Sequence, residues 1–145
     1  MLELLTHIGE LISTVYPTHT QYLTQMGSGF ERPSFFIYPI ASKQSNSNMS
    51  YYSRTTIIQI VYFDKLDKYQ NPNKLTQSEV LSTVSKLFAI PVILIPDRSK
   101  IMVEDLLTDF TADGDPYIQL TLREDFSNVI PDKGELMEEI DIKIK

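Results

Sequence analysis

Seven carboxylate side chains lie close together in the second half of the sequence and form its strongest pattern for chemistry. They are Glu104, Asp105, Asp109, Asp113, Asp115, Glu124 and Asp125. Hard cations such as Mg²⁺ bind carboxylate oxygens, and metal-assisted cleavage of a phosphodiester needs few other groups. The spacing fits no calcium-binding loop, however, and strand alternation predicts that Glu104 and Asp105 point to opposite faces. The pattern favours charges on a solvated sheet edge, which oppose unwanted strand pairing, over a metal-dependent nuclease.

The remaining candidates for chemistry are few. The chain has no cysteine, which excludes disulfides, thiolate nucleophiles and cysteine-based zinc sites. His7 falls off the apolar stripe of a predicted helix and His19 lies in a threonine-rich link, so both are predicted to be solvated. Ser28, between two glycines, lacks the strand-to-helix elbow of a nucleophilic serine and is predicted to lie in a flexible turn. We therefore assign no catalytic, cofactor-binding or metal-binding residue and expect no enzymatic activity.

Composition predicts one soluble, folded domain over residues 1–145. Hydrophobic residues make up 42% and charged residues 22%, close to globular averages. The net charge is −6 with scattered basic residues, which argues against a protein whose main ligand is a phosphate backbone. The N-terminus lacks the basic region of a signal peptide, and no apolar run approaches the roughly 20 residues that a membrane helix needs. Synthesis in the cytoplasm without membrane contact is the expectation.

Apolar spacing predicts two amphipathic helices. The first carries Leu2, Leu5, Ile8 or Gly9, Ile12 and Val15 at intervals of three and four residues and ends before Pro17. The second lies within residues 72–90 and carries Leu75, Val80 or Leu81, Val84, Leu87 and Phe88. Each predicted helix has one apolar face, which we expect to pack against a sheet.

Alternating apolar residues and turn signals predict the strands. They occupy residues 20–24, 33–40, 51–63, 92–95, 100–110 and 117–126, with a C-terminal strand or arm at 135–145. Residues 111–116 form a hairpin connection in which Asp113 and Gly114 suit positive φ angles, and the polar segment Ala41–Ser50 is predicted to be a loop between neighbouring antiparallel strands. The fold class is α+β: a mostly antiparallel sheet with two helices packed on one face.

The predicted strand at 51–63 has apolar residues on both of its faces, so both faces need to be covered. Ile57, Val61 and Phe63 point to one face, yet Ile58 and Ile60 point to the other, so both faces are apolar. Aromatic residues in these strands could stack on bases, but without interleaved lysine and arginine a core or a protein interface is the favoured interpretation.

Four segments also resemble, in order and spacing, a family of small tail terminator proteins of bacteriophages and prophages. They are GSGFERPSFFIYPI at 27–40, YYSRTTIIQIVYF at 51–63, LLTDF at 106–110 and MEEIDIKI at 137–144, with fixed points at Phe30, Pro33, Phe35 and Met137. The resemblance runs from the first helix to the last strand.

The resemblance implies a structural role. Such proteins form a ring, typically a hexamer, on the head-proximal end of the tail tube, where they stop tube growth and present a surface to the neck. The implied partners are further copies of the chain, the tail tube protein and a neck or head-to-tail connector protein, with DNA only passing through the lumen. The implied location is the virion tail, assembled in the host bacterial cytoplasm. The alternatives are another neck connector and, less favoured, the metal-dependent nuclease.

Two hypotheses about mechanism follow. The C-terminal strand pairs with a neighbouring subunit or with the tube, because a terminal arm can add to an exposed sheet edge. The acidic balance predicts a lumen that does not retain DNA, because retention needs basic groups that release counterions. Interfaces are expected on the second face of the central strands, in Ala41–Ser50 and in the C-terminal strand.

Overall fold

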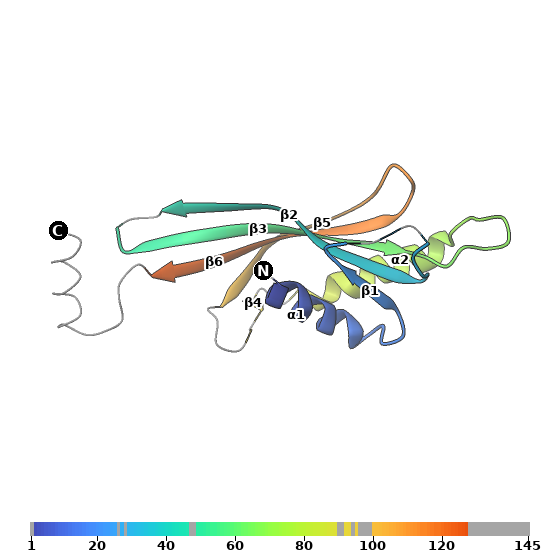
Figure 1. Cartoon of the computed structure of the whole chain (residues 1–145), viewed down its shortest axis with the longest axis horizontal. Coiled ribbons are helices and arrows are strands. Elements are labelled where there is room, and N and C mark those ends of the chain that lie inside the picture. The colour runs from blue at the N-terminus through green and yellow to red at the C-terminus, as the bar shows by residue number, and fades with distance from the viewer. Residues whose placement is uncertain are drawn as a thin grey trace.

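The computed structural model describes residues 2–25, 27, 29–46, 49–89, 92–93, 95 and 100–127. Two helices and six strands follow one another in the order α1 (Leu2–Ser13), β1 (Thr20–Leu23), β2 (Ser34–Asn46), β3 (Tyr51–Phe63), α2 (Lys74–Leu87), β4 (Val92–Ile93), β5 (Ile101–Phe110) and β6 (Pro116–Ser127). All six strands belong to one sheet (Figure 1). The predicted α+β class is confirmed, and no helix in the described ranges is long and apolar enough to cross a membrane.

The sheet has the strand order β1-β2-β3-β6-β5-β4. Every neighbouring pair is antiparallel except β1 and β2, which run parallel. The registers of β2 with β3 and of β5 with β6 each shift once, between Pro39 and Ala41 and between Val103 and Asp105. Such bulges bend a strand and turn one side chain out of strict alternation.

Both helices pack on the same face of the sheet, which we call the inner face. The core between them consists of α1 residues, α2 residues and the alternate residues of the strands that include Phe35, Ile37, Ile58, Ile60, Ile118, Leu120 and Leu122. Because these strand residues all lie on one side of the pleat, a single hydrophobic layer holds the domain together.

The apolar stripe predicted for α1 is correct in its middle and wrong at its ends. Leu5, Ile8 and Ile12 are fully buried, and Leu4 and Gly9 join them. Leu2 is 64% exposed and Val15 is 38% exposed. The helix ends at Ser13, so Val15 has already turned away, and Leu4 rather than Leu2 lies over the sheet.

Helix α2 begins at a cap made by Asn73. The Asn73 side chain accepts hydrogen bonds from the N–H groups of Leu75 and Thr76, which satisfies two donors of the first turn. Val80, Val84 and Phe88 are buried as predicted, but Leu75 is 70% exposed. The buried residue of this turn is Gln77, whose side-chain amide reaches across to the Gly114 carbonyl at 3.2 Å.

The prediction of a loop over Ala41–Ser50 is wrong for its first half. Residues 41–46 continue β2 and pair with β3 from Ile57 to Tyr52. Side chains of residues 41–46 are exposed on both faces. Strands β2, β3 and β6 run on beyond the helices here and form a long blade of residues 41–46, 51–55 and 123–127 (Figure 1). A polar sequence can thus form a strand when its backbone is paired and nothing covers it.

The remaining strands follow the prediction closely. Strand β3 has the predicted bounds, and the β5–β6 hairpin turns at Gly114, which has a φ of 88°. Asp113 does not have a positive φ. The predicted C-terminal strand at 135–145 and Ser28 lie outside the described residues.

Candidate interaction surface

The sheet face that turns away from both helices is the candidate functional site, and we call it the outer face. Register pairs Tyr38 with Gln59, Ile57 with Thr121 and Gln59 with Gln119, so these side chains share one side. The outer face is formed by Phe36, Tyr38, Ile57, Gln59, Val61, Phe63, Tyr117, Gln119, Thr121, Arg123, Asp105 and Leu107. This is the second apolar face that the sequence of β3 left unexplained.

One end of the outer face is covered by the chain itself. The ring of Phe30 packs against Phe63 with centroids 4.7 Å apart, and the Arg32 guanidinium lies over both rings at 4.9 and 5.5 Å. The Glu31 N–H donates to the Tyr22 hydroxyl at 2.9 Å, which ties this segment to β1. Aromatic and cation–π contacts thus cover the Phe63 end, while the middle of the face stays open.

The open middle combines half-buried aromatic rings with a row of amides. Phe36 and Tyr38 stack with centroids 4.4 Å apart. The Gln59 amide donates to the Tyr38 hydroxyl at 2.8 Å, and the Gln119 amide donates to Gln59 Oε1 at 3.5 Å. Burial raises the pKa of Tyr38, although the hydrogen bond from Gln59 opposes this shift. The raised pKa keeps the phenol neutral. A neutral surface of rings and amides is typical of a protein interface.

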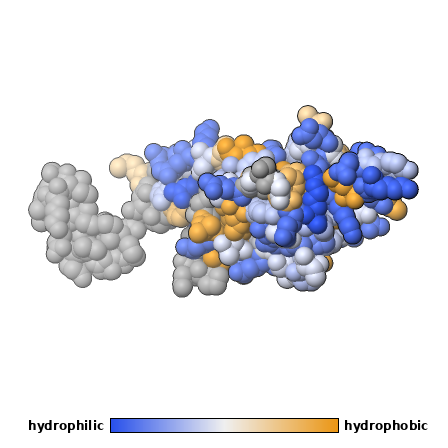
Figure 2. Space-filling view, turned by 45° about the vertical axis from the view of Figure 1, so that its right-hand side comes forward, coloured by the Kyte–Doolittle hydropathy of each residue, from blue (hydrophilic) through white to orange (hydrophobic). Residues whose placement is uncertain are grey.

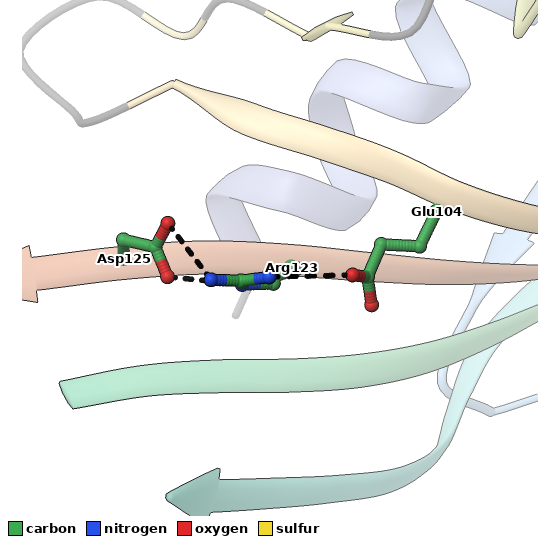
Figure 3. Close-up of polar contacts among 3 residues, drawn as sticks. All are labelled: Glu104, Arg123 and Asp125. Carbon is green, nitrogen blue, oxygen red and sulfur yellow. Dashed lines mark hydrogen bonds and ion pairs between the residues drawn. The ribbon is translucent and has the colours of Figure 1, made fainter. Parts of the chain in front are cut away.

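A charged cluster marks the end of the outer face nearest the blade (Figure 3). Arg123 lies between two carboxylates, with Nη1 3.6 Å from Glu104 and Nε 3.0 Å from Asp125. The hydrogen bond to Asp125 and the charge of Asp125 raise the pKa of Arg123 above its ordinary value. The bulge at Val103–Asp105 places Glu104 on the Arg123 side of the sheet, where Asp105 also lies, so the prediction that Glu104 and Asp105 point to opposite faces is wrong.

The other predicted carboxylates are dispersed. Asp105 and Asp109 are exposed on β5, and Asp113 is exposed in the hairpin. Glu124 is buried on the inner face, and Asp115 lies near Arg32, with burial raising its pKa against the effect of that charge. Within the described ranges no group of three His, Asp or Glu side chains could hold a metal ion. The structure thus does not bring the seven acids together into one site.

His19 was predicted to be solvated, but its side chain is half-buried. Its ring packs between Tyr16, Phe35 and Tyr62 with centroids 4.8 to 5.9 Å away. Burial lowers the pKa of His19, and the charge of Asp64 opposes that shift. Helix α1 ends at Ser13, and the link that follows brings His19 against Tyr62 near the end of β3, a tertiary contact that local sequence does not reveal. His7 is half-exposed on α1.

Asp64 is a buried carboxylate that no local sequence pattern marks. It is 3% exposed and accepts hydrogen bonds of 2.9 Å from the Tyr62 hydroxyl and from the Asn73 N–H. A cavity of about 720 Å³ opens beside it, lined also by His19, Pro33 and Thr76. The carboxylate joins the end of β3 to the cap of α2. These two hydrogen bonds account for its burial, so Asp64 is assigned a structural role.

The blade carries apolar side chains into solvent. Tyr52 stacks on Phe126 at 4.9 Å, and Arg54 lies over the same ring at 5.2 Å. Met49 is 96% exposed and Tyr51 52% exposed at its tip. Figure 2 shows hydrophobic patches that interrupt a largely hydrophilic surface. Patches of this kind on a folded domain are typical of interaction sites.

Comparison with known proteins identifies one family. A family model described as phage tail terminator protein matches residues 3–127, from the first turn of α1 to the last residue of β6. A search of the curated proteins found no match. The family match covers every described helix and strand and confirms the resemblance to this family, while the motif at 137–144 lies beyond the matched residues.

Proposed function

Because this chain belongs to the phage tail terminator family, we propose that it caps the head-proximal end of a phage tail tube as a ring of identical subunits, a hexamer. In this role it ends polymerisation of the tube and offers the surface to which the head or neck joins. Its site of action is the virion tail, and its assembly takes place in the cytoplasm of the host bacterium. We propose no catalytic role and no cofactor.

The open outer face is the observation that carries this proposal. Helices cover the inner face, whereas Phe36, Tyr38 and Ile57 lie half-buried on a face with no helix. Burying such a face against another subunit removes apolar area from water, which is the main favourable term in association. A head-to-tail contact of this kind closes into a ring when its rotation permits.

The partners follow from the two ends of such a ring. One side meets the tail tube protein and the other meets a neck or head-to-tail connector protein. DNA passes through the lumen without being retained, because a chain of net charge −6 offers little counterion release.

Tail assembly in the presence and absence of the chain tests the proposal. Tube protein that polymerises alone should give tubes of broadly distributed length, and the chain should narrow the distribution and appear by immunogold labelling at one tip only. Label along the whole tube, or tubes of unchanged length distribution, would contradict a terminator. DNA cleavage that requires Mg²⁺ and is lost in Asp109→Asn and Asp115→Asn variants would instead support the nuclease.

A further inference from the structure

Strand β5 has an open edge. Strand β6 pairs with β5 along its whole length, but β4 covers only Ile101 and Met102 on the other side. Within the part of the chain that the structure describes, no strand pairs with β5 beyond that point. Leu107 is 47% exposed and Phe110 is 39% exposed along this stretch. A long open edge with exposed apolar residues is a template for an added strand.

The hairpin geometry fixes which backbone groups face the open edge. The Thr111 N–H donates to the Asp115 carbonyl at 2.7 Å, so Thr111 directs its N–H toward β6. Along a strand, N–H and C=O groups alternate in direction with a period of two residues. Leu106, Thr108 and Phe110 therefore direct their N–H and C=O groups away from β6, to the open edge.

Two carboxylates occupy donors of this edge. Asp105 Oδ1 accepts the N–H of Leu106 at 2.9 Å, and Asp109 Oδ1 accepts the N–H of Phe110 at 2.8 Å. Two of the three edge donors, the N–H groups of Leu106 and Phe110, are thus satisfied from within the strand, and the two carboxylates add negative charge to the edge. Such contacts are local and exposed, so a backbone carbonyl from another strand can replace them at little cost.

The sequence contains a segment of matching chemistry. In residues 138–145, Ile140, Ile142 and Ile144 alternate with Asp141, Lys143 and Lys145. As a strand, this segment has one apolar side and one side that ends in two lysines. The apolar side matches the inner face at Leu106 and Val103, which pack against the core, and the lysines match the face of Asp105 and Asp109.

We propose that residues 138–145 of one copy of the chain add as a strand to the open β5 edge of a second copy. Carbonyl oxygens of the incoming strand take over the N–H groups of Leu106 and Phe110. The carboxylates of Asp105 and Asp109 are released. With Lys143 opposite Leu107, the Lys143 ammonium lies diagonal to both carboxylates and Lys145 lies opposite one of them. The inference rests on the proposed ring and names the contact that links its subunits.

A second copy fits this edge better than the chain's own C-terminus. Register places the end of β6 beyond Ile101, which pairs with Glu124. Strand β4 covers the edge of β5 at that end. The chain's own segment would have to pass around β4 to reach Leu106, whereas the segment of a neighbour meets no such obstacle.

Cysteine crosslinking tests the contact cleanly, because the chain has no cysteine of its own. Full-length Leu107→Cys and Lys143→Cys variants, mixed under mild oxidation, should give a crosslinked heterodimer in much higher yield than either variant alone. A Ser78→Cys variant, exposed on α2, mixed with Lys143→Cys is the matched control and should give little product. A chain carrying both Leu107→Cys and Lys143→Cys that closes within itself and yields no dimer would overturn the proposal.

Charge reversal supplies an independent readout. Lys143→Glu with Lys145→Glu should weaken self-association several-fold in sedimentation experiments, and a partner chain with Asp105→Lys and Asp109→Lys should restore it. Association that is indifferent to both pairs of changes would overturn the contact but leave the tail function untouched. If the crosslink forms but the chain does not limit tube length, the contact between copies stands and only the proposed terminator function is contradicted.

Discussion

The side-chain amide of Gln21 in β1 donates a hydrogen bond of 2.7 Å to the carbonyl oxygen of Gly9 in α1. The same amide donates to the Ser13 hydroxyl at 3.0 Å. A Cβ at position 9 would collide with Gln21 Oε1 and approach Ile37. The first helix therefore lies against the sheet through a close approach of its backbone at Gly9, and a larger residue there would have to displace the end of the Gln21 side chain.

Replacing Gly9 by alanine should destabilise the protein. In an exposed helix interior, Gly→Ala raises stability by up to about 1 kcal/mol. Here the added methyl must displace the end of the Gln21 side chain from its hydrogen bonds with Gly9 and Ser13, and we expect a net loss of up to about 2 kcal/mol. Urea unfolding measures it, and Thr6→Ala, on the exposed side of the same helix, is the control. A stabilised Gly9→Ala variant would show that the hydrogen bonds of Gln21 to α1 contribute little to stability.

Asp64 should be sensitive to the loss of one acceptor oxygen. Its two oxygens accept from the Tyr62 hydroxyl and from the Asn73 N–H. In Asp64→Asn one of these donors faces an amide N–H instead, and we expect a loss of about 1–3 kcal/mol in the free energy of unfolding. The exposed Asp113→Asn variant serves as the control in the same urea titration. Equal midpoints for both variants would remove Asp64 from its proposed place between β3 and α2.

Burial of His19 predicts a dependence of stability on pH. Its folded-state pKa is lowered from 6.5, so the unfolded chain binds the proton more readily. Stability is then fully present above pH 6.5 and falls as the pH drops through that value. Urea midpoints at pH 8 and pH 6 should differ in the parent and in His7→Asn, and the difference should shrink in His19→Asn. An unchanged difference in His19→Asn would assign the effect to other groups.

The middle of the outer face should tolerate a charge in the monomer but not in the assembly. Thr121 is half-buried there, between Ile57 and Asp105. Thr121→Arg leaves the core intact, so we expect unfolding within about 0.5 kcal/mol of the parent but a loss of self-association and of tube-length control. Ser78→Arg, exposed on α2, should change neither. Normal assembly of Thr121→Arg would place the interface elsewhere.

Much of the fold follows from local sequence. Period-two spacing predicted β3 from Tyr51 to Phe63 and the β5–β6 hairpin, and helical spacing predicted both helices. These predictions succeed because the spacing of apolar residues within each element shows which of its residues face the core. Of the family motifs, those at 51–63 and 106–110 lie on β3 and β5, and the one at 27–40 runs into β2, so the family was predictable without the structure.

The candidate surface was only partly predictable. The sequence of β3 indicated a second apolar face, but which residues stay open depended on Phe30 and Arg32 folding over Phe63, far away in the chain. Glu104 joined Arg123 because of a bulge, and His19 met Tyr62 through a turn. The open edge of β5 likewise depends on β4 pairing with only two of its residues. Periodicity is local, so each stretch of the chain predicts its own helix or strand. Which faces and edges stay uncovered depends on where distant segments end, and that is visible only in the folded chain.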